Sequence, residues 1–276
     1  MQAIYPGGRT HVADYELIKS LGEGNHGRFY LARPPRRIDL GVEFVAVKVF
    51  NGACSEDAFR RCVRELRAFA SAESPYLATI YDAALDNEFL YAMEYFPLGS
   101  LAMPARPLSH DHVLRAVEHA AHAVHALHEA GLAHRDVKPS NILLHEGGAK
   151  LSDLGLSQML TPGMTVTAMG PTESVEFMHP TLLYGEPASR ATDIWSLGAT
   201  LHRALAKTSL YGEIPQDPLL AVRTVLRTKP HVAPELTEQE AELVLDCLAE
   251  PGRQPATAEV VAERIAAIRA TLPSGR

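Results

Sequence analysis

The chain has 276 residues, 46% of them hydrophobic, which is enough for one large domain or for two lobes with separate cores. Its net charge of -7 argues against general binding to nucleic acids or anionic membranes, and no apolar run is long enough to span a bilayer. Three widely spaced cysteines and the lack of an apolar signal region predict a cytoplasmic protein, or the cytosolic part of a longer one.

The first part of the chain is predicted to form short strands and one helix. Residues 1–14 are polar, contain Pro and Gly, and are expected to form a flexible leader. Alternating apolar patterns then indicate strands, and a glycine-rich turn joins the first two into a hairpin. Five strands are expected over 15–21, 28–32, 44–50, 79–84 and 89–95, and a helix over 56–72.

The second part is predicted to be mostly helical. Ser109 is a plausible N-cap for a helix of about five turns that ends at Gly131. The segment from Gly155 to Pro180 is rich in Ser, Thr, Gly and Pro, which is typical of functional or disordered loops. Short strands are expected over 142–144 and 150–152, and further helices over 191–205, 218–226, 238–248 and 256–270.

A glycine cluster, Gly22-Glu-Gly24-Asn-His-Gly27, lies in the first hairpin. Glycines let a backbone approach phosphate groups and offer N–H donors to them. A dinucleotide-binding site would place this turn between a strand and a helix, whereas here it lies between two strands. Taken alone, the cluster is also compatible with an ordinary hairpin.

Lys48 lies in an apolar strand, Ala46-Val-Lys48, where an ammonium group needs an acidic partner or a ligand. Glu65, in the following helix, is the candidate partner. Taken singly, both side chains could equally be solvated, because charged residues are mostly exposed.

The stretch from His134 to Asn141 (His-Arg-Asp-Val-Lys-Pro-Ser-Asn) combines three kinds of polar group. Asp136 can take or orient a hydroxyl proton, Lys138 can neutralise a phosphoryl group in transfer, and the Asn141 amide can hold a metal ion. Asp153 adds a carboxylate twelve residues after Asn141. Alone, each stretch could be a polar surface turn.

Together these motifs resemble the eukaryotic-type Ser/Thr protein kinases, and most closely the bacterial members of that group. The resemblance covers about residues 15–270 and includes the segments Met93–Leu101 and Asp193–Gly198. It implies a two-lobed α+β protein kinase fold within residues 15–272. The expected parts are a five-stranded antiparallel lobe with one helix (15–95), a hinge (94–98) and a mainly helical lobe (98–272).

The resemblance also implies a role for each residue. Lys48, paired with Glu65, contacts the ATP phosphates, Asp136 is the catalytic base or orienter, and Lys138 offsets developing charge. Mg²⁺, or Mn²⁺ in its place, is held by Asn141 and Asp153. The residues expected to contact ATP are Gly22, Gly24, Gly27, Phe29, Ala46, Lys48, Met93, Glu94, Phe96 and Leu143.

The implied reaction is transfer of the γ-phosphoryl group of ATP to Ser or Thr hydroxyls of proteins, with autophosphorylation in the activation loop. Thr165 and Thr167 resemble the autophosphorylated residues of bacterial kinases, and Ser174 is expected to contact the catalytic Asp and Lys. Asp193 is expected to anchor the backbone of the catalytic loop. The implied partners are a protein substrate and a second copy bound through the first lobe, without nucleic acid or membrane.

Two departures from the family pattern leave an alternative open. Phe29 replaces a usual Val near the adenine, and Thr181 replaces the Glu that normally pairs with the Arg represented here by Arg253. Both departures would suit a pseudokinase that acts as an ATP-binding scaffold. A small-molecule kinase of the aminoglycoside type is a second alternative, although such enzymes lack the Lys-x-x-Asn sequence in this form.

Four histidines recur every three residues on the long predicted helix: His119, His122, His125 and His128. A step of three drifts around a helix of 3.6 residues per turn, and no Cys or acidic cluster accompanies them. We therefore expect most of them to be solvated or half-buried instead of binding a metal.

Overall fold

The computed structural model describes residues 10–24, 27–52, 54–86, 88–155 and 172–272. Their contacts divide the chain into two compact units. The described part of the first unit comprises residues up to 70 and 78–96, and that of the second comprises 71–77, 97–155 and 172–272. Residues 71–77 thus belong to the second unit, although Ser71 is the last residue of the helix of the first unit.

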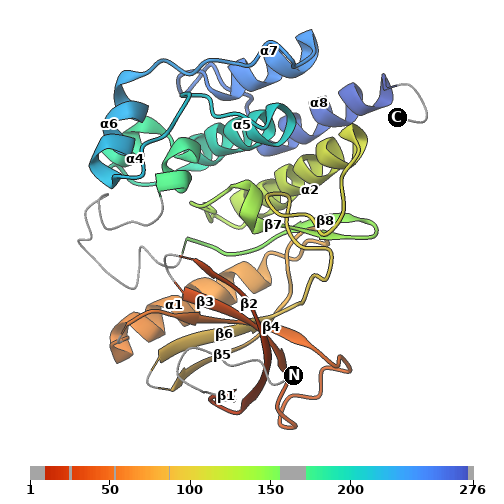
Figure 1. The fold of residues 1–276 in the computed structure, drawn as a ribbon, viewed down its shortest axis with the longest axis vertical. Helices are drawn as coiled ribbons and strands as arrows, with labels where there is room; N and C mark the ends of the chain where they lie inside the picture. Colours follow the sequence, from red (N-terminus) through yellow and green to blue (C-terminus); the bar gives the residue numbers. More distant parts are fainter. Residues whose placement is uncertain (1–9, 25–26, 53, 87, 156–171, 273–276) are drawn as a thin grey trace. The chain divides into compact units, whose positions relative to one another are not determined.

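The first unit is an antiparallel sheet with strand order β1-β2-β3-β4-β6-β5 and one helix, α1 (Figure 1). The Phe59 ring of α1 meets the Phe89 ring of β6 edge-on, with centroids 5.7 Å apart. The buried residues of α1 are spaced three or four apart, as expected for one packed face. The elements are β1 (His11–Val12), β2 (Tyr15–Gly24), β3 (Gly27–Arg33), β4 (Val45–Phe50), α1 (Glu56–Ser71), β5 (Ile80–Asp86) and β6 (Glu88–Met93).

The sheet has six strands, so the predicted number of five is wrong. The additional strand is β1, in which Val12 pairs with Tyr15. The prediction of a flexible leader is therefore also wrong for residues 11–12, because Val12 is buried in the core of this sheet. Two residues are too few to show the period-two alternation by which a strand is detected in a sequence.

The second unit is mainly helical, with a small hairpin of two strands (Figure 1). The side chain of Ser109 accepts a hydrogen bond from His112 N, which confirms the predicted N-cap. Its elements are α2 (His110–Glu129), η1 (Pro139–Asn141), β7 (Ile142–His145), β8 (Gly148–Leu151), η3 (Thr172–Phe177), α4 (Pro180–Leu183), α5 (Arg190–Ala206), α6 (Pro218–Arg227), α7 (Glu238–Cys247) and α8 (Ala258–Ala270).

Helix α5 is the buried centre of this unit. Ser189 and Thr192 form a reciprocal capping box at its start, which fixes the first turn and therefore the position of Asp193. Gly198 permits α7 to approach closely, because a Cβ atom at this position would collide with the side chain of Cys247. Helix α5 thus supplies a rigid base for the polar groups described below.

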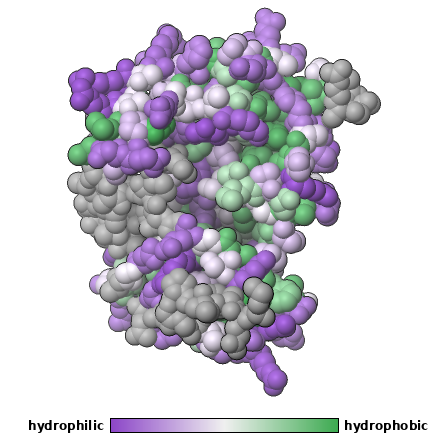
Figure 2. All heavy atoms as spheres, in the orientation of Figure 1, coloured by the Kyte–Doolittle hydropathy of each residue, from purple (hydrophilic) through white to green (hydrophobic). Residues whose placement is uncertain are grey.

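Helix α2 packs beside α8, and charged side chains connect the two helices. The Arg269 guanidinium lies 2.9 Å from an Asp111 oxygen and 2.6 Å from a Glu118 oxygen. On the face of this unit in view in Figure 2, polar residues predominate and apolar residues form smaller groups. Among the described residues, no helix is both long and apolar enough to cross a membrane.

The four histidines of α2 have different surroundings. His119 and His122 lie against the Tyr76 ring, and His125 is 3.3 Å from a Glu259 oxygen. His128 is buried, and its Nε2 lies 2.9 Å from Oδ2 of Asp193. Within the described ranges, no group of three or more His, Cys, Asp or Glu could hold a metal ion.

Candidate active site

The loop from His134 to Asn141 is anchored by the buried carboxylate of Asp193. Oδ2 of Asp193 accepts a hydrogen bond from His134 N at 2.7 Å, and Oδ1 accepts one from Arg135 N at 2.9 Å. His128 binds the same carboxylate from α2. The role predicted for Asp193 is confirmed, because three groups from two segments converge on one charge.

The His134 side chain is fully buried behind this loop. Burial lowers the pKa of its imidazole, which keeps the ring neutral. Its Nε2 lies 3.1 Å from the Ser152 carbonyl oxygen, and its Nδ1 accepts a hydrogen bond from Asp136 N at 3.3 Å. The imidazole therefore ties the backbone of Asp136 to the residue that precedes Asp153.

Two non-glycine residues of the site have a left-handed backbone: Arg135 at φ 73° and Asp153 at φ 62°. Each such conformation costs of the order of 1 kcal/mol and persists where surrounding contacts hold it. Contacts that hold this segment include the bond from Arg135 N to Asp193 and the neighbouring bond from Gly155 N to His134 O, 3.1 Å long. Strain of this kind is typical of functional sites.

Asp136, Lys138 and Asn141 form one cluster. Lys138 Nζ lies 2.8 Å from Asp136 Oδ2 and donates to Ser174 Oγ at 3.1 Å. Asn141 Nδ2 donates to the Asp136 main-chain oxygen at 2.7 Å and to its Oδ2 at 3.0 Å. About a quarter of the Asp136 side chain remains exposed, so another molecule can reach it. The expected contact of Ser174 with Lys138 is confirmed.

Asn141 and Asp153 fit the chemistry of a magnesium site. The amide nitrogen of Asn141 is occupied by Asp136, which leaves the amide oxygen as the group suited to a cation. Ser152 N and Oγ both donate to the Asn141 main-chain oxygen, at 2.9 and 3.2 Å, and this brings Asp153 next to Asn141. A carboxylate and an amide oxygen are the hard ligands that Mg²⁺ prefers.

In the first unit, the glycine cluster forms the end of the β2–β3 hairpin, in which Gly24 pairs with Gly27. Gly22 has a φ of 145°, which side chains rarely adopt. The lack of a side chain at Gly27 also serves packing within the sheet, because a Cβ atom there would collide with the main-chain oxygen of Val49 on β4.

Lys48 lies on β4, opposite Phe29 of β3. Its Nζ is 4.9 Å from the centroid of the Phe29 ring and 5.0 Å from that of Phe50, so aromatic faces contact the buried ammonium. Phe29, the first departure from the family pattern, therefore has a partner within its own sheet. The ion pair of Lys48 with Glu65 of α1 stays a prediction.

The remaining residues expected to contact ATP lie in both units. Ala46 pairs with Met93 across β4 and β6, and Glu94 N donates to Thr79 O at 2.9 Å. Phe96 is buried in the first unit. Leu143 lies in the second unit, on β7, where it pairs with Lys150.

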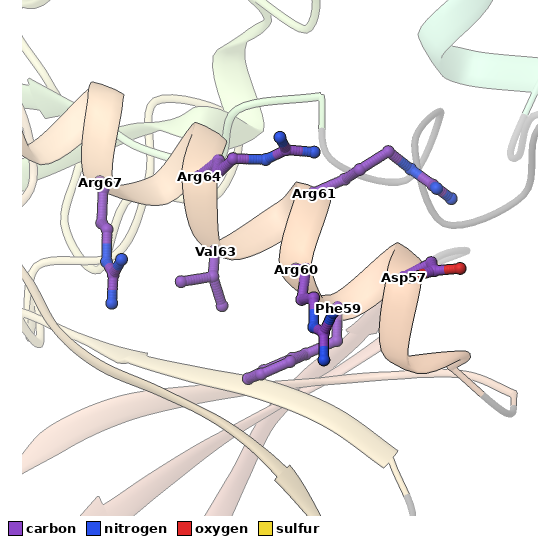
Figure 3. Close-up of a pocket in the computed structure, with 7 residues that line it drawn as sticks. All are labelled: Asp57, Phe59, Arg60, Arg61, Val63, Arg64 and Arg67. Carbon is purple, nitrogen blue, oxygen red and sulfur yellow. The ribbon is translucent and has the colours of Figure 1, made fainter.

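A pocket of about 640 Å³ lies on α1, and its described lining contains none of the residues predicted for the site. Figure 3 shows that Arg61 and Arg64 project from one side of the helix, whereas Phe59, Val63 and Arg67 project from the other. Thr165 and Thr167, the expected phosphorylation sites, lie outside the described residues.

One pair in the second unit was not predicted from the sequence. Arg203 of α5 binds Glu176 of η3 through two hydrogen bonds of 2.6 and 2.7 Å. No local pattern indicates this pair, because its members are 27 residues apart and charged residues are mostly exposed.

Comparison with known proteins decides the family. The protein kinase domain family matches residues 15–264. The chain belongs to the protein kinase family. Its predicted α+β kinase fold and its resemblance to eukaryotic-type Ser/Thr kinases are thereby confirmed.

Three relatives show how widely this kinase domain is shared. The probable serine/threonine-protein kinase PkwA of Thermomonospora curvata is 29% identical over 95% of this chain and 35% of its own length. Serine/threonine-protein kinase PrkC of Bacillus subtilis is 30% identical over 77% of the chain and 33% of its own length. Mitogen-activated protein kinase kinase 1 of Arabidopsis thaliana is 33% identical over 69% of the chain and 54% of its own length. The chain thus spans about a third to a half of these relatives.

Proposed function

We propose that this chain transfers the γ-phosphoryl group of ATP to Ser or Thr hydroxyls of proteins, including its own activation loop. The observation that carries the proposal is the cluster at Asp136. The Lys138 ammonium and the Asn141 amide nitrogen lie 2.8 and 3.0 Å from the same oxygen of the Asp136 carboxylate, and the carboxylate remains accessible.

The residues of the second unit suit the acceptor side of the reaction. Asp136 would accept the hydroxyl proton, and Lys138 would offset the negative charge that develops on the transferred group. Asn141 holds Asp136 through two hydrogen bonds, and Asp193 holds the loop, so little reorganisation is needed during the reaction.

The residues of the first unit suit the nucleotide. The glycine hairpin and Lys48 would contact the phosphates, and Ala46 and Met93 would line the adenine site. Since Glu94 N already donates to Thr79, the Glu94 carbonyl is the group we assign to the base. Mg²⁺ or Mn²⁺, held by Asn141 and Asp153, would neutralise phosphate charge.

The pseudokinase alternative gains no support from the site. The Phe29 ring lies against the Lys48 ammonium, and Lys138 and Asn141 both contact the Asp136 carboxylate. A homodimer through the first unit and a cytoplasmic location are further proposals, which rest on the sequence alone.

The test uses purified protein with Mg-ATP labelled at the γ-phosphate and histone as a generic acceptor. Acid hydrolysis should release labelled phosphoserine or phosphothreonine, and Lys48→Met should abolish the label. If wild type binds Mg-ATP but labels neither histone nor itself, the chain is a pseudokinase. Label on an aminoglycoside but on no protein would indicate a small-molecule kinase.

A further inference from the structure

Positions 181 and 253 normally form a Glu–Arg ion pair in this family, but here position 181 is a threonine. Thr181 stays within the cap of α4, where its Oγ1 lies 2.9 Å from His179 Nδ1 and its N–H donates to the same nitrogen at 3.2 Å. The Arg253 side chain is exposed. Its neighbour Gln254 instead holds the turn, by donating to the main-chain oxygens of Ala191 and Cys247 at 3.2 and 2.8 Å.

An ion pair of the same chemical kind occurs nearby, between Glu176 and Arg203. Nε and Nη2 of the guanidinium bind the two carboxylate oxygens separately, so the pair is bidentate. Only 3% of the Glu176 side chain is exposed, against 34% for Arg203. The carboxylate is therefore the buried partner, and removal of the guanidinium would leave its charge uncompensated.

Two further contacts attach the same stretch to α5. Ser196 Oγ donates to the Phe177 main-chain oxygen at 2.7 Å, and the His179 ring meets the Trp195 ring edge-on with centroids 4.8 Å apart. Ser196 and Arg203 are seven residues apart, which places them on one face of α5, two turns from each other. The stretch 174–179 thus runs along this face.

The same stretch also meets the catalytic cluster. Ser174, two residues before Glu176, accepts the hydrogen bond from Lys138. We infer that the Glu176–Arg203 pair positions residues 174–179 for the protein acceptor, and that it replaces the ion pair which Thr181 and Arg253 do not form. Both are positioning residues, because they act through Ser174 and Lys138. The inference rests on the proposed kinase activity for its consequence in catalysis.

A buried ion pair adds little net stability, but it can select one arrangement over others, because any shift leaves a charge unpaired. Loss of Arg203 alone leaves the Glu176 carboxylate buried and unpaired, so it should both weaken the fold and displace the stretch 174–179. The acceptor should bind less well, whereas the nucleotide residues of the first unit should be unaffected.

The test compares Arg203→Met with Arg264→Met. Arg264 is the control for loss of a guanidinium of similar exposure: it is 33% exposed and binds Asp246, whose side chain is 44% exposed, at 2.6 Å between α7 and α8. Hydrogen exchange of residues 174–179, and the KM values for histone and for ATP, are measured in full-length protein. Arg203→Met should raise exchange in 174–179 and the KM for histone about tenfold, with the KM for ATP within about twofold.

Arg264→Met should change neither the hydrogen exchange of residues 174–179 nor the KM for histone. Arg203→Lys keeps the positive charge but cannot form the bidentate contact of a guanidinium, so it should give intermediate values. Equal effects of both Met variants, or unchanged exchange in 174–179, would overturn the inference. If Arg203→Met does not fold, Arg203→Lys decides by the same two measurements. Hydrogen exchange can be measured without catalysis. If wild type shows no kinase activity but Arg203→Met still raises hydrogen exchange in residues 174–179 alone, the proposed activity is refuted and the positioning role is retained.

Discussion

The carboxylate of Asp193 accepts a hydrogen bond of 2.7 Å from the main-chain N–H of His134, 59 residues earlier in the chain. Asp193 is fixed by the capped first turn of α5, and His134 opens the loop that carries Asp136. The orientation of the catalytic loop therefore depends on one buried charge.

We expect Asp193→Asn to lower the free energy of unfolding by about 3 kcal/mol, because the two main-chain donors and His128 lose a shared ionised acceptor. Denaturant unfolding measures this change. Asp246→Asn is the control, since its carboxylate is 44% exposed and its loss should cost less than about 1 kcal/mol. Equal losses in the two variants would contradict the anchoring role.

Ser174→Ala should lower kcat for histone about tenfold, because Lys138 loses its 3.1 Å hydrogen bond to the Ser174 hydroxyl. Ser174→Thr keeps the hydroxyl and should retain most of the activity. Steady-state kinetics with both variants checks this. A Thr variant as impaired as the Ala variant would show that the hydroxyl is not the important feature.

The sequence predicted well what depends on local patterns. The apolar periodicity of α1 and α2, the Ser109 cap and the glycine hairpin all appear where they were expected. Lys138 and Asn141 contact Asp136 as a cluster, because the three residues lie within a few positions of one another in the sequence.

The features that the sequence did not reveal depend on distant partners. The spacing of the four histidines on α2 did not indicate that His128 would bind the buried carboxylate of Asp193, 65 residues away. No sequence pattern around Glu176 indicates that its carboxylate will form an ion pair with Arg203. A single sequence predicts which charges exist but not which of them meet after packing.

Protein stability should fall at acidic pH because of His202. Burial lowers the pKa of its imidazole to about 4, and its Nε2 accepts a hydrogen bond from Ala233 N at 3.0 Å. Well above pH 6.5 the imidazole is neutral in both the folded and the unfolded state, so His202 contributes no pH dependence there. As pH falls from 6.5 towards 4, His202 becomes protonated in the unfolded state but stays mostly neutral in the folded state. The free energy of unfolding therefore decreases.

At pH 5 this difference amounts to a loss of about 2 kcal/mol of stability relative to pH 7.5. His202→Gln keeps an acceptor for Ala233 but cannot titrate, so it should lose about 2 kcal/mol less over that range. Urea unfolding at the two pH values measures both losses. The same pH dependence in wild type and variant would rule out His202 as the cause.

Tyr211→Phe should leave stability unchanged or raise it by up to about 1 kcal/mol. The Tyr211 hydroxyl is buried and has no hydrogen-bond partner among the described residues, and burial together with the charge of Glu176 raises its pKa. Thermal unfolding of the variant checks this. A clear loss of stability would show that the hydroxyl is bonded.

The most direct test of the central claim is a mass-spectrometric map of phosphorylated residues after incubation with Mg-ATP. Wild type, Asp136→Asn and Lys48→Met are compared, with nucleotide binding measured in parallel. Phosphate on Ser or Thr in wild type, lost in Asp136→Asn although that variant still binds Mg-ATP, is the predicted result. A wild type that binds Mg-ATP yet carries no more phosphate than Asp136→Asn would contradict phosphoryl transfer at Asp136.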